Sequence, residues 1–128
     1  MEFSEVYQNY PVGLLLQAES DIKKIEKMLN KGRCVVAVEN GATAGCYVLH
    51  EPKRGAAAEM MIVVVDEAFR GKGVARALFA DAENRAKQDG FSVLQKQTPS
   101  AECPVAKLCA SAGYAEDGET PNLWKKTL

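Results

Sequence analysis

One segment constrains the fold more than any other, because an apolar run, a charged turn, two glycines and an amphipathic stretch follow one another directly. Residues 60–65 are the longest apolar run in the chain, and Gly71 and Gly73 stand just before the amphipathic pattern that begins at Val74. This order predicts a strand that leads through a short turn into a helix. The first turn of a helix has free backbone N–H groups and the positive end of the helix dipole. We therefore expect an anion-binding site at this turn.

The other patterns predict strands and helices on both sides of this segment. Further strands are expected at residues 1–7, 33–39, 43–50, 91–98, 114–119 and 122–128, and the third long strand at 58–65. Helices are expected at residues 11–19, from the N-cap Ser20 to Gly32, from Val74 to Asp89-Gly90, and from Pro104 to Gly113. Asn40-Gly41 is a strong hairpin signal, and a helical crossover makes the strand at 91–98 parallel to the one at 58–65. The predicted order is β-α-α-β-β-β-α-β-α-β-β in one domain over residues 1–128.

The glycine turn also resembles a known cofactor-binding motif. Arg70-Gly71-Lys72-Gly73-Val74-Ala75 matches the pattern Arg or Gln, two residues, Gly, one residue, then Gly or Ala. That pattern binds acyl-CoA in the GNAT superfamily of N-acetyltransferases, and the element order along the whole chain is similar to that family's. The resemblance implies an α/β (α+β) fold with a mixed, mostly antiparallel sheet flanked by helices and a β-α-β cofactor-binding unit. It also implies transfer of an acetyl group from acetyl-CoA to a primary amine by direct attack.

The resemblance assigns the cofactor to the strand and the turn. Backbone amides of residues 70–75 would surround the pyrophosphate, since Gly71 and Gly73 have no Cβ and let phosphate oxygens approach. Full positive charges would come from Arg70, Lys72 and Arg76. The strand would pair through its backbone with the pantetheine arm, as though the arm were an added strand. The predicted cofactor-binding residues are Val63, Val64, Val65, Arg70, Gly71, Lys72, Gly73, Val74, Ala75 and Arg76.

Glu59 is the candidate general base. An alkyl ammonium has a pKa of about 10.4, so an amine nucleophile must lose a proton before it attacks at neutral pH. Many members of the family carry a glutamate near this point of the strand. Strand alternation places Glu59 on the same face as Met61, Val63 and Val65 unless a bulge intervenes. The alternative is an exposed glutamate at the start of a strand.

Cys109 occupies the place where the family usually has a tyrosine that protonates the leaving CoA thiolate. The family pattern is Leu-Tyr-x-x-x-Gly-Phe, and here residues 108–114 run from Leu108-Cys109 to Gly113-Tyr114. A thiol has a pKa of about 8.5, close to that of the leaving group, so Cys109 could donate the proton. The other interpretation is a small core residue on the buried face of the helix.

Composition excludes several classes of function. The formal net charge of −1 gives no indication of a nucleic-acid partner, and no apolar run approaches the length of a membrane span or a signal peptide. The four cysteines form no C-x-x-C pair and His50 stands alone, so no metal site is expected. Reduced core cysteines favour a cytoplasmic protein.

Two alternatives remain open at this level, and so does the assembly state. The fold could serve a non-catalytic acyl-CoA-binding regulatory module, which the cysteine at the acid position favours. It could also be a nucleotide- or phosphate-binding domain of another α/β type. The acceptor would be a small-molecule or protein amine, and a homodimer is possible because members of the family often dimerise.

Overall fold

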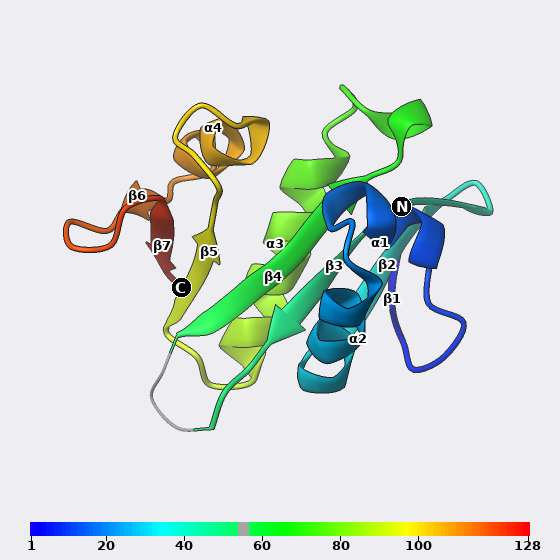
Figure 1. Ribbon diagram of the computed structural model, residues 1–128, viewed down its shortest axis with the longest axis horizontal. Coiled ribbons are helices and arrows are strands. Elements are labelled where there is room, and N and C mark those ends of the chain that lie inside the picture. Colours follow the sequence, from blue (N-terminus) through cyan, green and yellow to red (C-terminus); the bar gives the residue numbers. More distant parts are fainter. Residues whose placement is uncertain (54–56) are drawn as a thin grey trace.

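The computed structural model describes residues 1–53 and 57–128, and its elements follow the predicted order (Figure 1). They are β1 (Glu2–Val6), α1 (Val12–Ala18), α2 (Ile22–Lys31), β2 (Arg33–Glu39), β3 (Ala42–His50), β4 (Ala58–Val65), the short 3-10 helix η1 (Glu67–Phe69), α3 (Val74–Gln88), β5 (Val93–Gln97), α4 (Pro104–Ser111), β6 (Ala115–Glu116) and β7 (Leu123–Thr127). Pro52 to Gly55 also predicts a turn from its composition, and part of this turn lies outside the described residues.

The strands form one seven-stranded sheet in the order β1-β2-β3-β4-β5-β7-β6. β4 and β5 pair in parallel, as the crossover through α3 predicts, and the other neighbouring strands pair antiparallel. The predicted mixed, mostly antiparallel sheet is therefore confirmed. Its parallel junction is the one place where a connection along the chain requires a helix between two neighbouring strands.

Helices cover both faces of the sheet (Figure 1). On one face, α3 packs on the sheet through the apolar side of its predicted amphipathic pattern, whose residues are all buried: Val74, Leu78, Phe79, Ala82 and Ala86. On the other face, Leu15 of α1 and Ile25 of α2 pack against Cys34 and Cys46 of the sheet. The two apolar faces of the sheet thus have separate cores.

The ends of α2 differ in detail from the prediction. Its N-cap is Asp21, whose carboxylate accepts from the Lys23 amide at 3.0 Å, whereas Ser20 lies one residue further out. Gly32 ends the helix in an extended conformation with φ of −118°. A Cβ at Gly32 would lie 2.8 Å from Val48 Cγ1 and 2.9 Å from the Leu49 carbonyl oxygen. This glycine is required by the close approach of the helix end to β3 and not by a left-handed turn.

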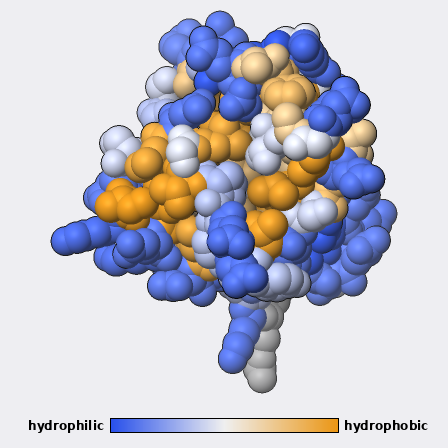
Figure 2. Space-filling view, turned by 90° about the vertical axis from the view of Figure 1, so that its right-hand side faces the viewer, coloured by the Kyte–Doolittle hydropathy of each residue, from blue (hydrophilic) through white to orange (hydrophobic). Residues whose placement is uncertain are grey.

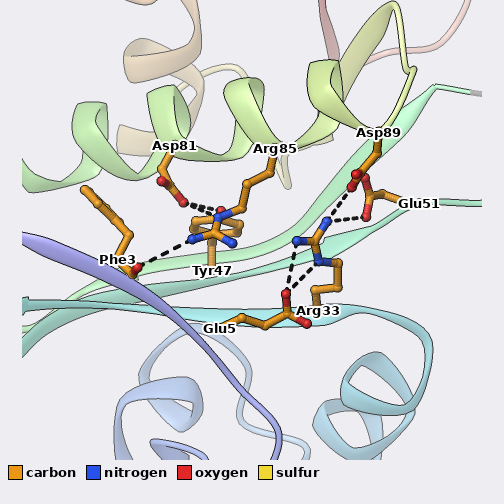
Figure 3. Close-up of polar contacts among 8 residues, drawn as sticks. All are labelled: Phe3, Glu5, Arg33, Tyr47, Glu51, Asp81, Arg85 and Asp89. Carbon is orange, nitrogen blue, oxygen red and sulfur yellow. Dashed lines mark hydrogen bonds and ion pairs between the residues drawn. The ribbon is translucent and has the colours of Figure 1, made fainter.

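A partly buried arginine, Arg33, links β1, β2, the segment after β3 and the end of α3. Arg33 of β2 donates to Glu5 of β1 at 3.0 Å, to Glu51 after β3 at 2.8 Å, and to Asp89 at the end of α3 (Figure 3). Burial alone would lower the pKa of Arg33, but its hydrogen bonds to Glu51 and Glu5 raise the pKa above the usual value. The guanidinium therefore stays charged and joins four segments.

A second polar contact holds α3 against the middle of the sheet. The Tyr47 hydroxyl donates to Asp81 at 2.6 Å, and Arg85 Nε donates to the same carboxylate at 2.8 Å (Figure 3). Burial and the hydrogen bond to Asp81 raise the pKa of Tyr47. Arg85 also reaches the Phe3 carbonyl of β1 at 3.5 Å. Strands β1 and β3 are thereby linked to one helix.

The N-terminal elements leave large apolar side chains exposed. Tyr7, Val12, Leu16 and Ile22 are each at least two-fifths accessible to solvent. Figure 2 shows the face on the right-hand side of Figure 1, where apolar groups alternate with hydrophilic ones. Of the helices that the structure describes, none has the length and apolar content needed to cross a membrane.

Candidate functional site

The sheet opens between β4 and β5. The two strands pair at Ala58–Leu94 and Glu59–Gln95, near the start of β4. No further pairing joins them among the described residues, and the strands diverge beyond this point (Figure 1). The later part of β4 therefore has one edge paired with β3 and one edge free.

A bulge in β4 lies just beyond the last pairing with β5. Across the sheet, Val48 of β3 faces Ile62 and Leu49 faces Met60, so Met61 is an extra residue in β4. Met60 packs in the core beneath α3, whereas Ile62 packs in the core beneath α1 and α2. Even-numbered residues of β4 therefore change faces at the bulge.

The bulge also changes which residues of β4 lie on the same face as Glu59. Val63 and Val65 pack against the core beneath α3, on the side that Met60 occupies before the bulge. Glu59 alternates with Met60 and so lies on the opposite face. An unbulged strand would place Glu59 on the same face as Val63 and Val65. This expectation is wrong, because the extra residue Met61 interrupts the alternation.

The backbone groups of β4 alternate between its two edges. The Asp66 amide donates to the Ala44 carbonyl at 2.8 Å, which makes these two residues a hydrogen-bonded pair. Hydrogen-bonded and non-hydrogen-bonded pairs alternate along an antiparallel ladder. Val64 is therefore bonded to β3, and the N–H and C=O groups of Val63 and Val65 face the free edge. A strand-like ligand arm could pair with them.

The turn after β4 presents free amides. Gly71 and Gly73 have φ of +77° and +80°, and a Cβ built on either would meet no atom within 4 Å. These positions need glycine for their left-handed backbone, and the space around them is open. Within the described part of the chain, the amides of residues 71–76 have no hydrogen-bond acceptor. They form a ready anion-binding turn at the N-terminus of α3.

The three predicted cations hold different positions around this turn. Arg70 Nε lies 3.4 Å from the carbonyl oxygen of the last β4 residue. Lys72 Nζ lies over the ring of Phe69, 5.7 Å from its centroid. Arg76 reaches across to α4 and donates to Ser111 Oγ at 3.1 Å. Arg70 and Arg76 therefore lie on the two sides of the free amides.

Two cavities join along the free edge of β4. The larger has a volume of about 690 Å³ and the smaller, at the glycine turn, about 280 Å³. Val65, Arg70, Ala75 and Leu108 line both, so the two form one continuous groove. The larger part is mainly apolar, and its polar lining comes from Gln17, Glu19, Arg70, Lys96 and Cys103.

The structure brings most of the predicted cofactor residues to this groove. Val63, Val64, Val65, Arg70 and Ala75 line the larger part. Arg70, Gly71, Gly73, Val74, Ala75 and Arg76 line the smaller part. Lys72 lines neither, since its ammonium lies over Phe69.

Lys96 is a lining residue that the sequence analysis missed. It follows Leu94 by two residues in β5, so its side chain leaves the same face of the strand as that fully buried leucine. Its Nζ donates to the Met61 carbonyl of the bulge at 3.1 Å. The signal was a charged residue at an inward position of a strand pattern, which is unusual without a partner or a role.

Glu59 lies at the junction where β4 and β5 begin to diverge. It is half-buried, pairs with His50 of β3, and is not among the residues that line the groove. Its charge acts on Lys96, since the carboxylate raises the pKa of that lysine. Glu59 therefore acts electrostatically on a residue that lines the groove without lining the groove itself.

Cys109 lies inside the core beneath α3 and α4. Its side chain is fully buried, and burial raises the pKa of its thiol to about 11. The groove is lined by its neighbour Leu108 and not by Cys109 itself. Among the residues described, no three His, Cys, Asp or Glu side chains gather as a metal site would require.

Comparisons with known proteins agree on one family. The model of the acetyltransferase (GNAT) family matches residues 2–114. A curated relative, an uncharacterized N-acetyltransferase named YvbK from Bacillus subtilis (strain 168), is 26% identical over 114 residues, which are 89% of this chain and 73% of the relative.

Solved structures show the same fold. A GNAT family acetyltransferase from Elizabethkingia anophelis with acetyl-CoA bound superposes with a TM-score of 0.87 at 22% identity, covering 99% of this chain and 97% of the other. An acetyltransferase from Bacillus subtilis in complex with CoA gives a TM-score of 0.85 at 21% identity, covering 98% of this chain and 97% of the other.

Proposed function

The chain belongs to the acetyltransferase (GNAT) family, and from this premise we propose that residues 1–128 form one domain that transfers an acetyl group from acetyl-CoA to a primary amine. The amine would attack the thioester directly in a ternary complex. The observation that carries the proposal is the continuous groove, which joins a turn of free amides to an unpaired strand edge.

The groove matches the two chemically different parts of coenzyme A. The free amides of residues 71–76, with Arg70 and Arg76 beside them, suit the pyrophosphate because they offer neutral donors and full charges together. The outward backbone groups of Val63 and Val65 suit the amide-containing pantetheine arm. The apolar lining from α4 suits the methylene groups of the arm. Fold neighbours hold acetyl-CoA or CoA, which supports the same ligand here.

Glutamate substitution at Gly73 tests the cofactor site, and Gly41 provides a matched control. Both glycines have φ near +80° and open space around an added Cβ, so Gly73→Glu and Gly41→Glu carry the same backbone strain. Gly73→Glu adds a negative charge at the pyrophosphate turn, whereas Gly41→Glu places it in the β2–β3 hairpin, which does not line the groove. We expect acetyl-CoA affinity, measured by isothermal titration, to fall at least about a hundredfold in Gly73→Glu, equal to about 2.7 kcal/mol. Equal affinities in the two variants would remove the turn from the site.

We propose Glu59 as the general base, acting through water. Its support is its position at the junction of β4 and β5 and its electrostatic contact with Lys96, which lines the groove. Glu59→Gln keeps the size of the side chain and removes the proton acceptor. We expect kcat to fall on the order of a hundredfold, the usual size of a base contribution, with acetyl-CoA affinity unchanged. A wild-type pH–rate profile in Glu59→Gln would exclude this role.

The role of Cys109 as the acid stays a prediction of the sequence. In its favour, a raised pKa keeps the thiol protonated at neutral pH. Because the side chain is fully buried, its proton would have to pass through a group that lines the groove. Cys109→Ala distinguishes the two interpretations, since loss of an acid lowers kcat and loss of a core residue lowers stability alone.

The second candidate function is a non-catalytic acyl-CoA-binding module, and the burial of Cys109 at the family's acid position is the observation that favours it. A panel of spermidine, lysine, kanamycin and a lysine-containing peptide, with released CoA detected by a thiol reagent, separates the two. CoA release with any amine supports the enzyme, while tight binding of acetyl-CoA without release supports the module.

Assembly and location also remain proposals. A homodimer could form through the exposed apolar side chains of the N-terminal elements, and sedimentation equilibrium of the wild type and of Leu16→Glu would test it. The four cysteines are free thiols, three of them buried, which is typical of a cytoplasmic protein.

A further inference from the structure

We propose that Lys96 gives a proton to the sulfur of coenzyme A as the thiolate leaves, an inference that rests on the proposed binding of acetyl-CoA in the groove. The residue stands on β5, across the open edge from the strand that would hold the pantetheine arm. Neither the glycine motif nor the tyrosine position of the family indicates it.

The direction of the groove locates the reactive end of the cofactor. With the pyrophosphate at residues 71–76, the arm runs back along the free edge of β4, past Val65 and Val63 toward Met61. From Val65 to Met61 this edge is about 13 Å long at the usual rise per strand residue. Beyond Met61 the edge closes, because Glu59 pairs with β5. The thioester must therefore stop near the bulge.

Lys96 is held at that closed end. Its Nζ donates one hydrogen bond to the Met61 carbonyl at 3.1 Å. An ammonium has three N–H donors, so two remain for other partners. Among the described residues, no carboxylate lies within 4.0 Å of it to form an ion pair, although the side chain lines the groove. The ammonium is thus anchored by a backbone carbonyl and is open toward the expected position of the sulfur.

The surroundings of Lys96 adjust its acidity in both directions. Burial lowers the pKa of the ammonium, while Cys109 of α4, Glu59 of β4 and Cys103 at the N-cap of α4 oppose this effect. Glu19, directly after α1, lines the same groove. The lowered pKa of the ammonium is closer to the pKa of the thiol of free CoA, which is near the usual thiol value of about 8.5. Proton transfer to the leaving sulfur is therefore less uphill than it would be from an exposed lysine.

The proposed step balances in atoms and charge. The neutral acceptor nitrogen forms a bond to the carbonyl carbon, the C–S bond breaks, and its electron pair goes to sulfur. One proton moves from Lys96 Nζ to that sulfur, which leaves as the CoA thiol. The acceptor nitrogen loses one proton to solvent, and solvent returns one to Lys96. The hydrogen bond from Lys96 Nζ to the Met61 carbonyl persists throughout, because the neutral amine of Lys96 still has N–H donors.

Binding of the product tests the inference without knowledge of the acceptor. Isothermal titration would compare CoA with desulfo-CoA, which lacks the sulfur, between pH 6.5 and 8.5. In the wild type we expect the ratio of CoA to desulfo-CoA affinity to rise with pH, because the ammonium favours the bound thiolate. Each unit by which the bound thiol pKa falls gives about a tenfold rise.

Two variants and one control make the outcome specific. Lys96→Met should give a ratio that does not change with pH, whereas Lys107→Met, which removes an exposed lysine of α4, should behave as the wild type. Lys96→Arg keeps the charge but has a far higher pKa, so it should retain the rise while kcat falls. A constant ratio in the wild type, or the same rise in Lys96→Met, would overturn the assignment. If neither CoA nor desulfo-CoA binds the wild type, the proposed function itself has failed.

Discussion

The two edges of β4 differ completely, although they belong to the same apolar strand. Toward β3, its residues pair from Glu59 to Val65, and the adjoining half of the sheet is further held by Arg33 and Tyr47 (Figure 3). Toward β5, pairing stops after Glu59 and a groove takes its place. The fully paired half of the sheet thus holds β4 in place while its other edge stays open.

The two halves of the sheet also differ in their polar contacts. Arg33 contacts carboxylates from three segments, so the closed half pairs its partly buried cation with anions of its own. At the open edge, Lys96 has a backbone carbonyl as its partner, and the amides of residues 71–76 have no acceptor within the described part of the chain. Amides at a helix N-terminus that have no acceptor in the protein are available to an anionic ligand.

The largest expected effect comes from proline at neighbouring positions of β4. Val64→Pro removes an N–H that bonds to β3 and should destabilise the protein by about 3 kcal/mol or more. Val63→Pro removes an N–H at the free edge, where proline is tolerated. It should cost far less stability but lower acetyl-CoA affinity five- to tenfold, the equivalent of about 1 kcal/mol for one hydrogen bond.

Urea unfolding and isothermal titration measure the two effects, and Val63→Ala corrects for the loss of the valine side chain. Equal destabilisation by the two prolines would contradict the assignment of the edges.

The next effect concerns the closed half alone. Arg33→Met leaves Glu5 and Glu51 without their cation, and we expect a loss of about 2 kcal/mol in the free energy of unfolding. Lys125→Met is the control, because its ion pair with Asp117 lies at the surface, where such pairs contribute little to stability. Affinity for acetyl-CoA should stay unchanged in both variants. A matching loss of affinity in Arg33→Met would show that the two regions are coupled.

Tyr47→Phe should cost about 1 kcal/mol, since it removes the hydrogen bond to Asp81. Burial raises the pKa of the Tyr47 hydroxyl, so above about pH 10 the unfolded chain loses this proton while the folded chain keeps it. Wild-type stability therefore falls as the pH rises through that range, and the variant lacks this contribution. Unfolding at pH 8 and pH 10.5 should thus show a difference between the two proteins that shrinks with pH.

The smallest effect is a gain in stability at the open edge. Burial lowers the pKa of Lys96, so the unfolded chain binds more protons than the folded chain up to the usual lysine pKa of about 10.4. Wild-type stability should rise with pH in the window that ends there. Lys96→Met removes this penalty and should therefore be slightly more stable than the wild type at pH 7. A destabilised Lys96→Met would show that the contact with Met61 outweighs the cost of burial.

Much of the fold could be predicted from local signals. The stripe from Val74 to Ala86, the Asn40-Gly41 hairpin and the first turn of α4 at Pro104 each rest on spacing or on one residue's backbone preference. The N-cap of α2 was placed one residue early, because Ser20 and Asp21 both cap well and the sequence does not decide between them.

In the candidate site too, some residues follow from local sequence signals and others depend on contacts between distant segments. Gly71 and Gly73 could be identified from the sequence, since their left-handed backbone is a local requirement. The bulge at Met61 has no such signal in an unbroken apolar run, so the face of Glu59 could not be derived. Lys96 and Cys109 lie in β5 and α4, and their distance from β4 depends on how far the strands diverge.

The order of the elements, the glycine turn and its family follow from local patterns, because periodicity and backbone preference act over a few residues at a time. The separation of β4 and β5 after Glu59, the presence of Lys96 in the gap and the exclusion of Cys109 from it are visible only in the folded protein. Strand divergence and burial depend on contacts between segments far apart in the chain, and these exist only once the sheet has formed around its two cores.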